Sequence, residues 1–139
     1  MFGENLAKPR FKGTLEVYKS IIAYPESLYS PILVAGRPEI WLVSDHIKER
    51  LYELHQGHKD VFEILSREIW SCEVGKIKGD SGFFKDILDK YGLTPEEVVF
   101  VDDLYVNIRS AESAGLTSIQ FENAADLKNE LSELGFEFY

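Results

Sequence analysis

The feature that most constrains the fold is a run of four apolar residues, 98–101, that leads directly into Asp102 and Asp103. A short continuous apolar run of this kind is typical of a strand buried inside a parallel sheet. The two acids then lie at the carboxyl end of the strand, where open α/β sheets bind their ligands. Neighbouring carboxylates repel each other, and hard oxygen donors suit Mg²⁺. The alternative is that the pair only starts a turn and caps the next helix.

Predicted strands and helices alternate from residue 40 to residue 134. Alternation of this kind is the pattern of a doubly wound sheet, in which right-handed crossovers place helices on both faces. The sequence therefore predicts an α/β fold with a three-layer, Rossmann-like parallel sheet. The predicted strands are 40–43, 69–74, 98–101 and 117–121, and the predicted helices are 47–56, 84–91, 105–114 and 124–134.

The N-terminal part of the chain differs from this pattern. Apolar residues recur at near-helical spacing over 14–23, and Pro25 ends that predicted helix. A second helix is predicted over 26–35, although Pro31 lies inside it and the segment 32–35 is also compatible with a strand. We therefore divide the chain into a helical N-terminal part, 1–38, and an α/β core, 39–139.

Composition limits the partners and the compartment. The net charge of −9 argues against nucleic acid and against anionic membrane surfaces as main partners. No apolar run approaches the roughly 20 residues that a membrane span needs. The single cysteine, Cys72, cannot form an internal disulfide, so a cytoplasmic protein is expected.

Chemically capable side chains follow three of the predicted strands. Ser44 follows the first, Lys78 lies in the loop after the second, and the acid pair follows the third, with Asn107 one helical turn beyond Asp103. These loops open on one edge of a parallel sheet, so we expect a hydroxyl, a cation and two carboxylates to converge there. Taken singly, Ser44 is more often a helix cap, Lys78 a solvated lysine and Asn107 a helix-surface residue.

Three segments together resemble the haloacid dehalogenase superfamily of phosphohydrolases. The segment 42–46 looks like the second motif of that family, 71–78 looks like the third, and 99–103 with Asn107 looks like the fourth. The resemblance implies a haloacid-dehalogenase-like core, with 1–38 as the lead-in and the remnant of a helical cap domain.

The resemblance also implies roles for the site residues. Ser44 would bind the transferred phosphoryl group, and Lys78 would be a catalytic residue that steadies this group and the nucleophile. Asn107 would contribute to substrate binding. Asp103, with Asp102 as second acid, would hold Mg²⁺, and the substrate would be a small phosphorylated molecule.

The first motif of the family is absent. Members act through an Asp-x-Asp pair at the tip of the first, central strand, but no aspartate precedes Asp45 in this chain. Without the nucleophilic carboxylate an aspartyl-phosphate cannot form. One hypothesis is that the chain is part of a phosphohydrolase that needs a missing segment. The other is a non-catalytic module that binds a ligand or a protein.

The place of the first strand is equally open. An empty slot between the strands at 40–43 and 98–101 would leave two apolar edges unpaired, which is an aggregation hazard. These strands could pair directly, the segment 32–35 could fill the slot, or another chain could supply a strand. The last arrangement implies a homo-oligomer or a complementing partner chain.

Overall fold

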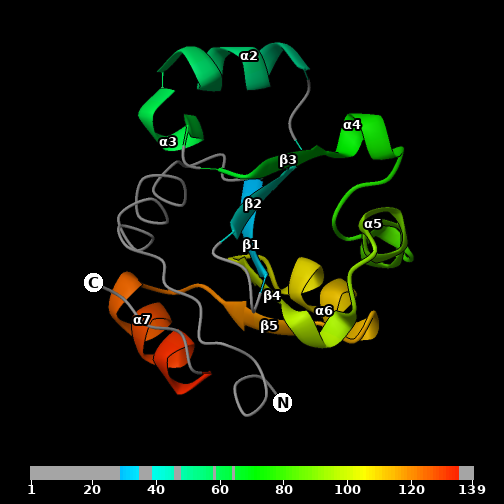
Figure 1. Ribbon diagram of the computed structural model, residues 1–139, viewed down its shortest axis with the longest axis vertical. Coiled ribbons are helices and arrows are strands. Elements are labelled where there is room, and N and C mark those ends of the chain that lie inside the picture. The colour runs from blue at the N-terminus through cyan, green and yellow to red at the C-terminus, as the bar shows by residue number, and fades with distance from the viewer. Residues whose placement is uncertain (1–28, 35–38, 46–47, 58, 64, 135–139) are drawn as a thin grey trace.

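A five-stranded mixed sheet forms the centre of the protein in a computed structural model (Figure 1). The structure describes residues 29–34, 39–45, 48–57, 59–63 and 65–134. The strands are β1 (Tyr29–Val34), β2 (Glu39–Ser44), β3 (Arg67–Trp70), β4 (Val98–Asp102) and β5 (Thr117–Gln120). The helices are α2 (Lys48–Gly57), α3 (Lys59–Glu63), α4 (Ser71–Val74), α5 (Phe83–Tyr91), α6 (Tyr105–Ser113) and α7 (Ala124–Glu133), with a 3₁₀ turn, η1 (Pro95–Glu97).

The strands are arranged in the order β3-β2-β1-β4-β5. The pairs β2–β3 and β4–β5 are parallel, as expected, but β1 is antiparallel to both of its neighbours. The prediction of an all-parallel sheet was therefore wrong. Only residues 35–38 separate β1 from β2. Because a parallel connection needs a dozen or more residues, consecutive strands so close in sequence pair as an antiparallel hairpin.

Strand β1 fills the slot between β2 and β4. Of the three arrangements considered, the structure therefore adopts the one in which the segment around 32–35 occupies the slot. The predicted helix over 26–35 was accordingly wrong at Tyr29–Val34. Ile32 and Leu33 are both fully buried although they point to opposite faces of the sheet. Two neighbouring apolar side chains that are both covered favour a central strand over a surface helix.

Helices cover both faces of the sheet (Figure 1). Phe84 and Ile87 of α5 and Ile108 of α6 pack with Phe100 of β4 on one face. On the other face Leu127 and Leu131 of α7 pack against strand residues that include Leu33, Val99 and Val101. The buried strand β4, with every residue inaccessible, belongs to both clusters, as the apolar run predicts.

Most other elements agree with the sequence prediction, with one further correction. Strand β3 ends at Trp70, and Ser71–Val74 form one turn of helix instead of continuing the strand to residue 74. Gly75 then ends this turn with a positive φ of 87°, a conformation that a side chain disfavours.

Two expectations concern residues that are not described. The predicted helix at 14–23 lies outside the described residues. Of the predicted N-terminal part, 1–38, only residues 29–34 are described, so the two-part organisation stays a prediction. Within the described part of the chain, no helix combines the length and the apolar character that crossing a membrane requires.

Candidate functional site

Lys78 and Asp102 form a buried ion pair at the carboxyl edge of the sheet. The Lys78 Nζ atom lies 3.1 Å from Asp102 Oδ2, and neither side chain is exposed to solvent. Removing two charges from water costs several kcal/mol per ion, so such a pair persists only where each charge has a close partner. The structure thus brings together two residues that stand 24 positions apart and that the sequence assigned to one site.

Two further hydrogen bonds help to hold the Asp102 carboxylate in one orientation. Its Oδ2 also accepts a hydrogen bond of 3.0 Å from Asn107 Nδ2, and its Oδ1 accepts one of 2.9 Å from the backbone N–H of Leu104. Asn107 is itself buried. Asn107 therefore lies at the predicted site, and here it positions the acid.

Ser44 and Asp103 occupy different environments. Ser44 is buried at the last position of β2, whereas Asp103 is exposed. Among the described residues, no three His, Cys, Asp or Glu side chains cluster so as to hold a metal ion. Mg²⁺ commonly binds through one or two carboxylates together with water and phosphate oxygens, and the adjacent pair supplies donors of that class.

Asp45 is a residue of this edge to which sequence reasoning gave no role. Its Oδ1 accepts hydrogen bonds from the Ser71 hydroxyl and from the backbone N–H of Lys78, the latter at 3.1 Å. Ser71 is buried at the start of α4. These partners are 26 and 33 residues away in sequence, so spacing alone carries no sign of the contacts.

Strand β1 presents its amino end to the same edge, because Tyr29 pairs with Ser44. The strand reads Tyr-Ser-Pro-Ile-Leu-Val and contains no carboxylate. Its pairing with β4 covers only Ile32–Val34. The central position of the sheet therefore contributes no acidic side chain to the site.

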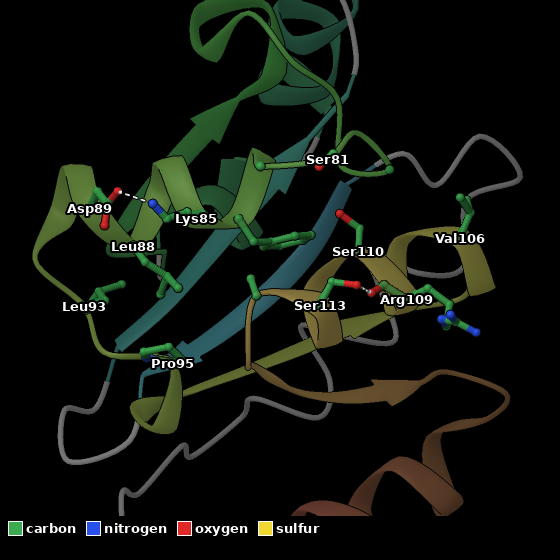
Figure 2. A pocket seen from close by; sticks show the side chains of 14 residues that line it. Ser81, Lys85, Leu88, Asp89, Leu93, Pro95, Val106, Arg109, Ser110 and Ser113 are labelled. Carbon is green, nitrogen blue, oxygen red and sulfur yellow. Dashed lines mark hydrogen bonds and ion pairs between the residues drawn. The ribbon is translucent and has the colours of Figure 1, made fainter.

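A separate cavity of about 730 Å³ lies between α5 and α6 (Figure 2). Leu88, Leu93 and Pro95 contribute to an apolar lining, while Lys85 turns toward Asp89 on the side of α5. None of the predicted site residues lines this cavity. The charged side chains that line this cavity do not converge on one point. We therefore take the buried ion pair, and not this cavity, as the candidate site.

Arg109 lines the same cavity from α6, with its charged end directed away from Leu88 (Figure 2). Its guanidinium donates a hydrogen bond of 3.3 Å to the Tyr105 hydroxyl. That hydrogen bond is the main cause that raises the pKa of Arg109 above its ordinary value. The group is therefore a permanent cation on the outer rim of the cavity.

Comparison with known proteins gives partial matches. The chain is 37% identical over 84 residues to flavin mononucleotide hydrolase 1 of Arabidopsis thaliana, covering 60% of this chain and 34% of the relative. It is 33% identical over 90 residues to bifunctional epoxide hydrolase 2 of Mus musculus, covering 65% of this chain and 15% of the relative. The chain thus spans about a third or less of these relatives. No family model matches the sequence.

Solved structures share the fold. A HAD family enzyme of Bacteroides thetaiotaomicron, in complex with magnesium and inorganic phosphate, aligns with a TM-score of 0.54 at 20% identity, covering 63% of this chain and 49% of that one. A hydrolase of Streptococcus pneumoniae aligns with a TM-score of 0.57 at 17% identity, covering 88% and 57%. The chain therefore shares the fold of these solved structures, and over part of its length it is similar in sequence to the two hydrolases.

Proposed function

We propose that the chain is the phosphate-binding core of a HAD-type phosphohydrolase. The observation that carries the proposal is the buried Lys78–Asp102 pair at the edge where Ser44 ends β2. A cation held at this edge suits the charge of a phosphoryl group. In this proposal Ser44 donates a hydrogen bond to a phosphoryl oxygen, Lys78 steadies the group, and Asn107 keeps Asp102 in place.

Asp103, with Asp102 beside it, is proposed to hold Mg²⁺ together with the phosphate. The contacts of Asp102 to Lys78, Asn107 and Leu104 make Asp103 the more accessible ligand. When bound, Mg²⁺ would neutralise charge on the phosphoryl oxygens. The solved HAD family enzyme that contains magnesium and phosphate supports this assignment by its fold.

The chain by itself is proposed to bind the ester without hydrolysing it. Nucleophilic catalysis of this type needs a carboxylate that attacks phosphorus. The central strand β1 has no acidic residue, and the sequence has no aspartate before Asp45. A missing segment that supplies the Asp-x-Asp pair would complete the enzyme.

The second candidate is a non-catalytic module that uses the same pocket, or only the fold, for binding. The antiparallel direction of β1 favours it, because the amino end of this strand now lies where the family places its nucleophile. Both candidates predict that the isolated chain is inactive. The phosphate pocket is absent only in the form of the second candidate that retains the fold alone.

Hydrolysis of p-nitrophenyl phosphate in the presence of Mg²⁺ is the first test. An aromatic ester is appropriate because exposed apolar side chains lie close in sequence to Lys78 and the acids: Ile77 and Leu104 on the loops, and Tyr105 at the start of α6. We expect the purified chain to show no turnover above the Asp103→Ala variant. Turnover that disappears in this variant would mean that another group supplies the nucleophile.

Binding of inorganic phosphate, measured by calorimetry with and without Mg²⁺, tests whether a phosphate pocket is present. The phosphate-binding proposal expects a saturable heat that Ser44→Ala weakens and that Lys85→Ala, a control at an exposed side chain of α5, leaves unchanged. Absence of any saturable binding would exclude the phosphate pocket and favour a module that retains only the fold.

A further inference from the structure

The loop that carries Lys78 is held in place by a residue outside the proposed set. Residues 75–78 lie between α4 and α5 and form no helix or strand. Lys78 is nevertheless completely buried, and its ammonium group reaches Asp102. A buried lysine on an irregular loop needs a contact that fixes the backbone, since the free loop could otherwise place the side chain in many ways.

Asp45 makes that contact. A single carboxylate oxygen, Oδ1, accepts both the Ser71 hydroxyl and the Lys78 backbone N–H. The first partner stands at the start of α4 and the second at the end of the loop, so Asp45 joins the two ends of the segment that leads to Lys78. Hydrogen bonds to an ionised acceptor are stronger than neutral ones.

The contacts distinguish this role from the simpler one of a helix cap. Aspartate shortly before a helix commonly accepts hydrogen bonds from the first N–H groups of that helix. Within the described residues, the side chain of Asp45 accepts from Ser71 and Lys78 and not from any residue of α2. Among the described residues, the side-chain hydrogen bonds of Asp45 therefore serve the Lys78 loop.

We propose that Asp45 is a positioning residue that sets the location of Lys78 for phosphate binding. This inference rests on the proposed function of the site as a phosphate pocket. The contribution of Asp45 is geometric, because its negative charge by itself opposes an anionic ligand. A carboxylate retained beside a phosphate pocket is explained if its benefit in fixing Lys78 exceeds that repulsion.

The test compares Asp45→Asn with Asp45→Ala, using inorganic phosphate as the probe in calorimetry. Both substitutions remove the negative charge, but asparagine keeps an oxygen that accepts the two hydrogen bonds. We expect the asparagine variant to bind phosphate at least as well as the wild type. We expect the alanine variant to lose about tenfold or more in affinity, by analogy with the loss on removing a residue that orients a metal ligand.

A second measurement needs no phosphate. In an NMR spectrum of the free protein, the Lys78 amide should be protected from hydrogen exchange in the wild type and in Asp45→Asn, and should lose protection in Asp45→Ala. Ser71→Ala removes one of the two hydrogen bonds without touching Asp45 or Lys78, and a partial loss is expected there. Asp89→Ala, on the exposed face of α5, is the control for loss of a carboxylate.

The outcomes separate this inference from the proposed function. Equal phosphate affinity of the alanine and asparagine variants, with the Lys78 amide equally protected in both, would overturn the positioning role. Loss of amide protection only in the alanine variant, with no phosphate binding even by the wild type, would support the loop contact and remove the proposed phosphate pocket. If Asp45→Ala does not fold, hydrogen exchange of the Lys78 amide in Ser71→Ala still tests the positioning role. Partial loss of protection would support this role, and unchanged protection would contradict it.

Discussion

At the scale of single residues, the ion pair between Lys78 and Asp102 is the most demanding feature of the molecule. Each charge is stripped of water, and the carboxylate is supported by Asn107 and the Leu104 N–H in addition to the lysine. The arrangement is costly if either partner is lost, because the remaining charge stays buried and uncompensated. This asymmetry makes the pair easy to test.

Lys78→Met should destabilise the fold by about 3–5 kcal/mol, since it leaves the Asp102 carboxylate without its cation. Combining it with Asp102→Asn should cost less than the sum of the two single changes, because the two residues interact directly. Chemical denaturation of the four proteins measures both quantities. Lys85→Met is the matched control, because the Lys85 side chain is 75% exposed and its ion pair with Asp89 is long, at 3.8 Å. This substitution should change the free energy of unfolding by less than about 0.5 kcal/mol.

Additivity of the two changes would contradict a direct Lys78–Asp102 interaction. It would place the ammonium group elsewhere in the protein and remove the main support for a phosphate pocket at this edge.

At the scale of elements, strand β1 decides the architecture. It pairs with β2 along its whole length and with β4 over Ile32–Val34, so it closes the sheet at its centre. The parallel halves on either side have the connections expected of an α/β protein. One short hairpin therefore joins two parallel pairs into a mixed sheet.

Ile32→Ala and Leu33→Ala should each cost about 2–5 kcal/mol, the usual loss for truncating a large buried aliphatic side chain. Both should be costly because the strand is covered on both faces, whereas a surface helix would expose one of two consecutive residues. Thermal or denaturant unfolding measures the effect. Leu104→Ala, at a side chain that is 44% exposed, is the control and should have little effect. A neutral result at either Ile32 or Leu33 would contradict the central position of β1.

At the scale of the whole molecule, the filled central slot bears on self-association. In the described part of the chain, the outermost strands are β3 and β5, each only four residues long, and short edges limit edge-to-edge pairing. No second chain is needed between β2 and β4. The homo-oligomer or complementing chain that an empty slot implies thus loses its main structural reason, although a partner that supplies a nucleophile remains part of the proposed function.

We expect the purified chain to be a monomer of 15.9 kDa at micromolar concentration, as measured by light scattering after size-exclusion chromatography. A stable dimer would show that another surface associates. The apolar cavity between α5 and α6 is then the first place to substitute, with Leu88→Asp as the disrupting variant.

Local sequence patterns were sufficient for much of the fold and for the convergence of Lys78 with Asp102. The strands β2 and β4 follow from apolar runs. Gly92 marks the end of α5, and Asn123, whose side chain accepts a hydrogen bond from the Asp126 N–H, marks the start of α7. These features depend on neighbouring residues, so they can be read from a single sequence. The convergence of Lys78 with Asp102 could be predicted because parallel strands end at one edge.

The sequence by itself thus determined that this chain is an α/β protein with a cation and two acids following its strands. Only the tertiary structure decided that Tyr29–Val34 is a central antiparallel strand, because a short apolar segment becomes helix or strand according to the edges available to it. Only the tertiary structure assigned contacts to Asp45, whose partners lie 26 and 33 residues away. Hydrogen bonds between residues so far apart in sequence depend on how the elements pack, and they cannot be predicted from local spacing.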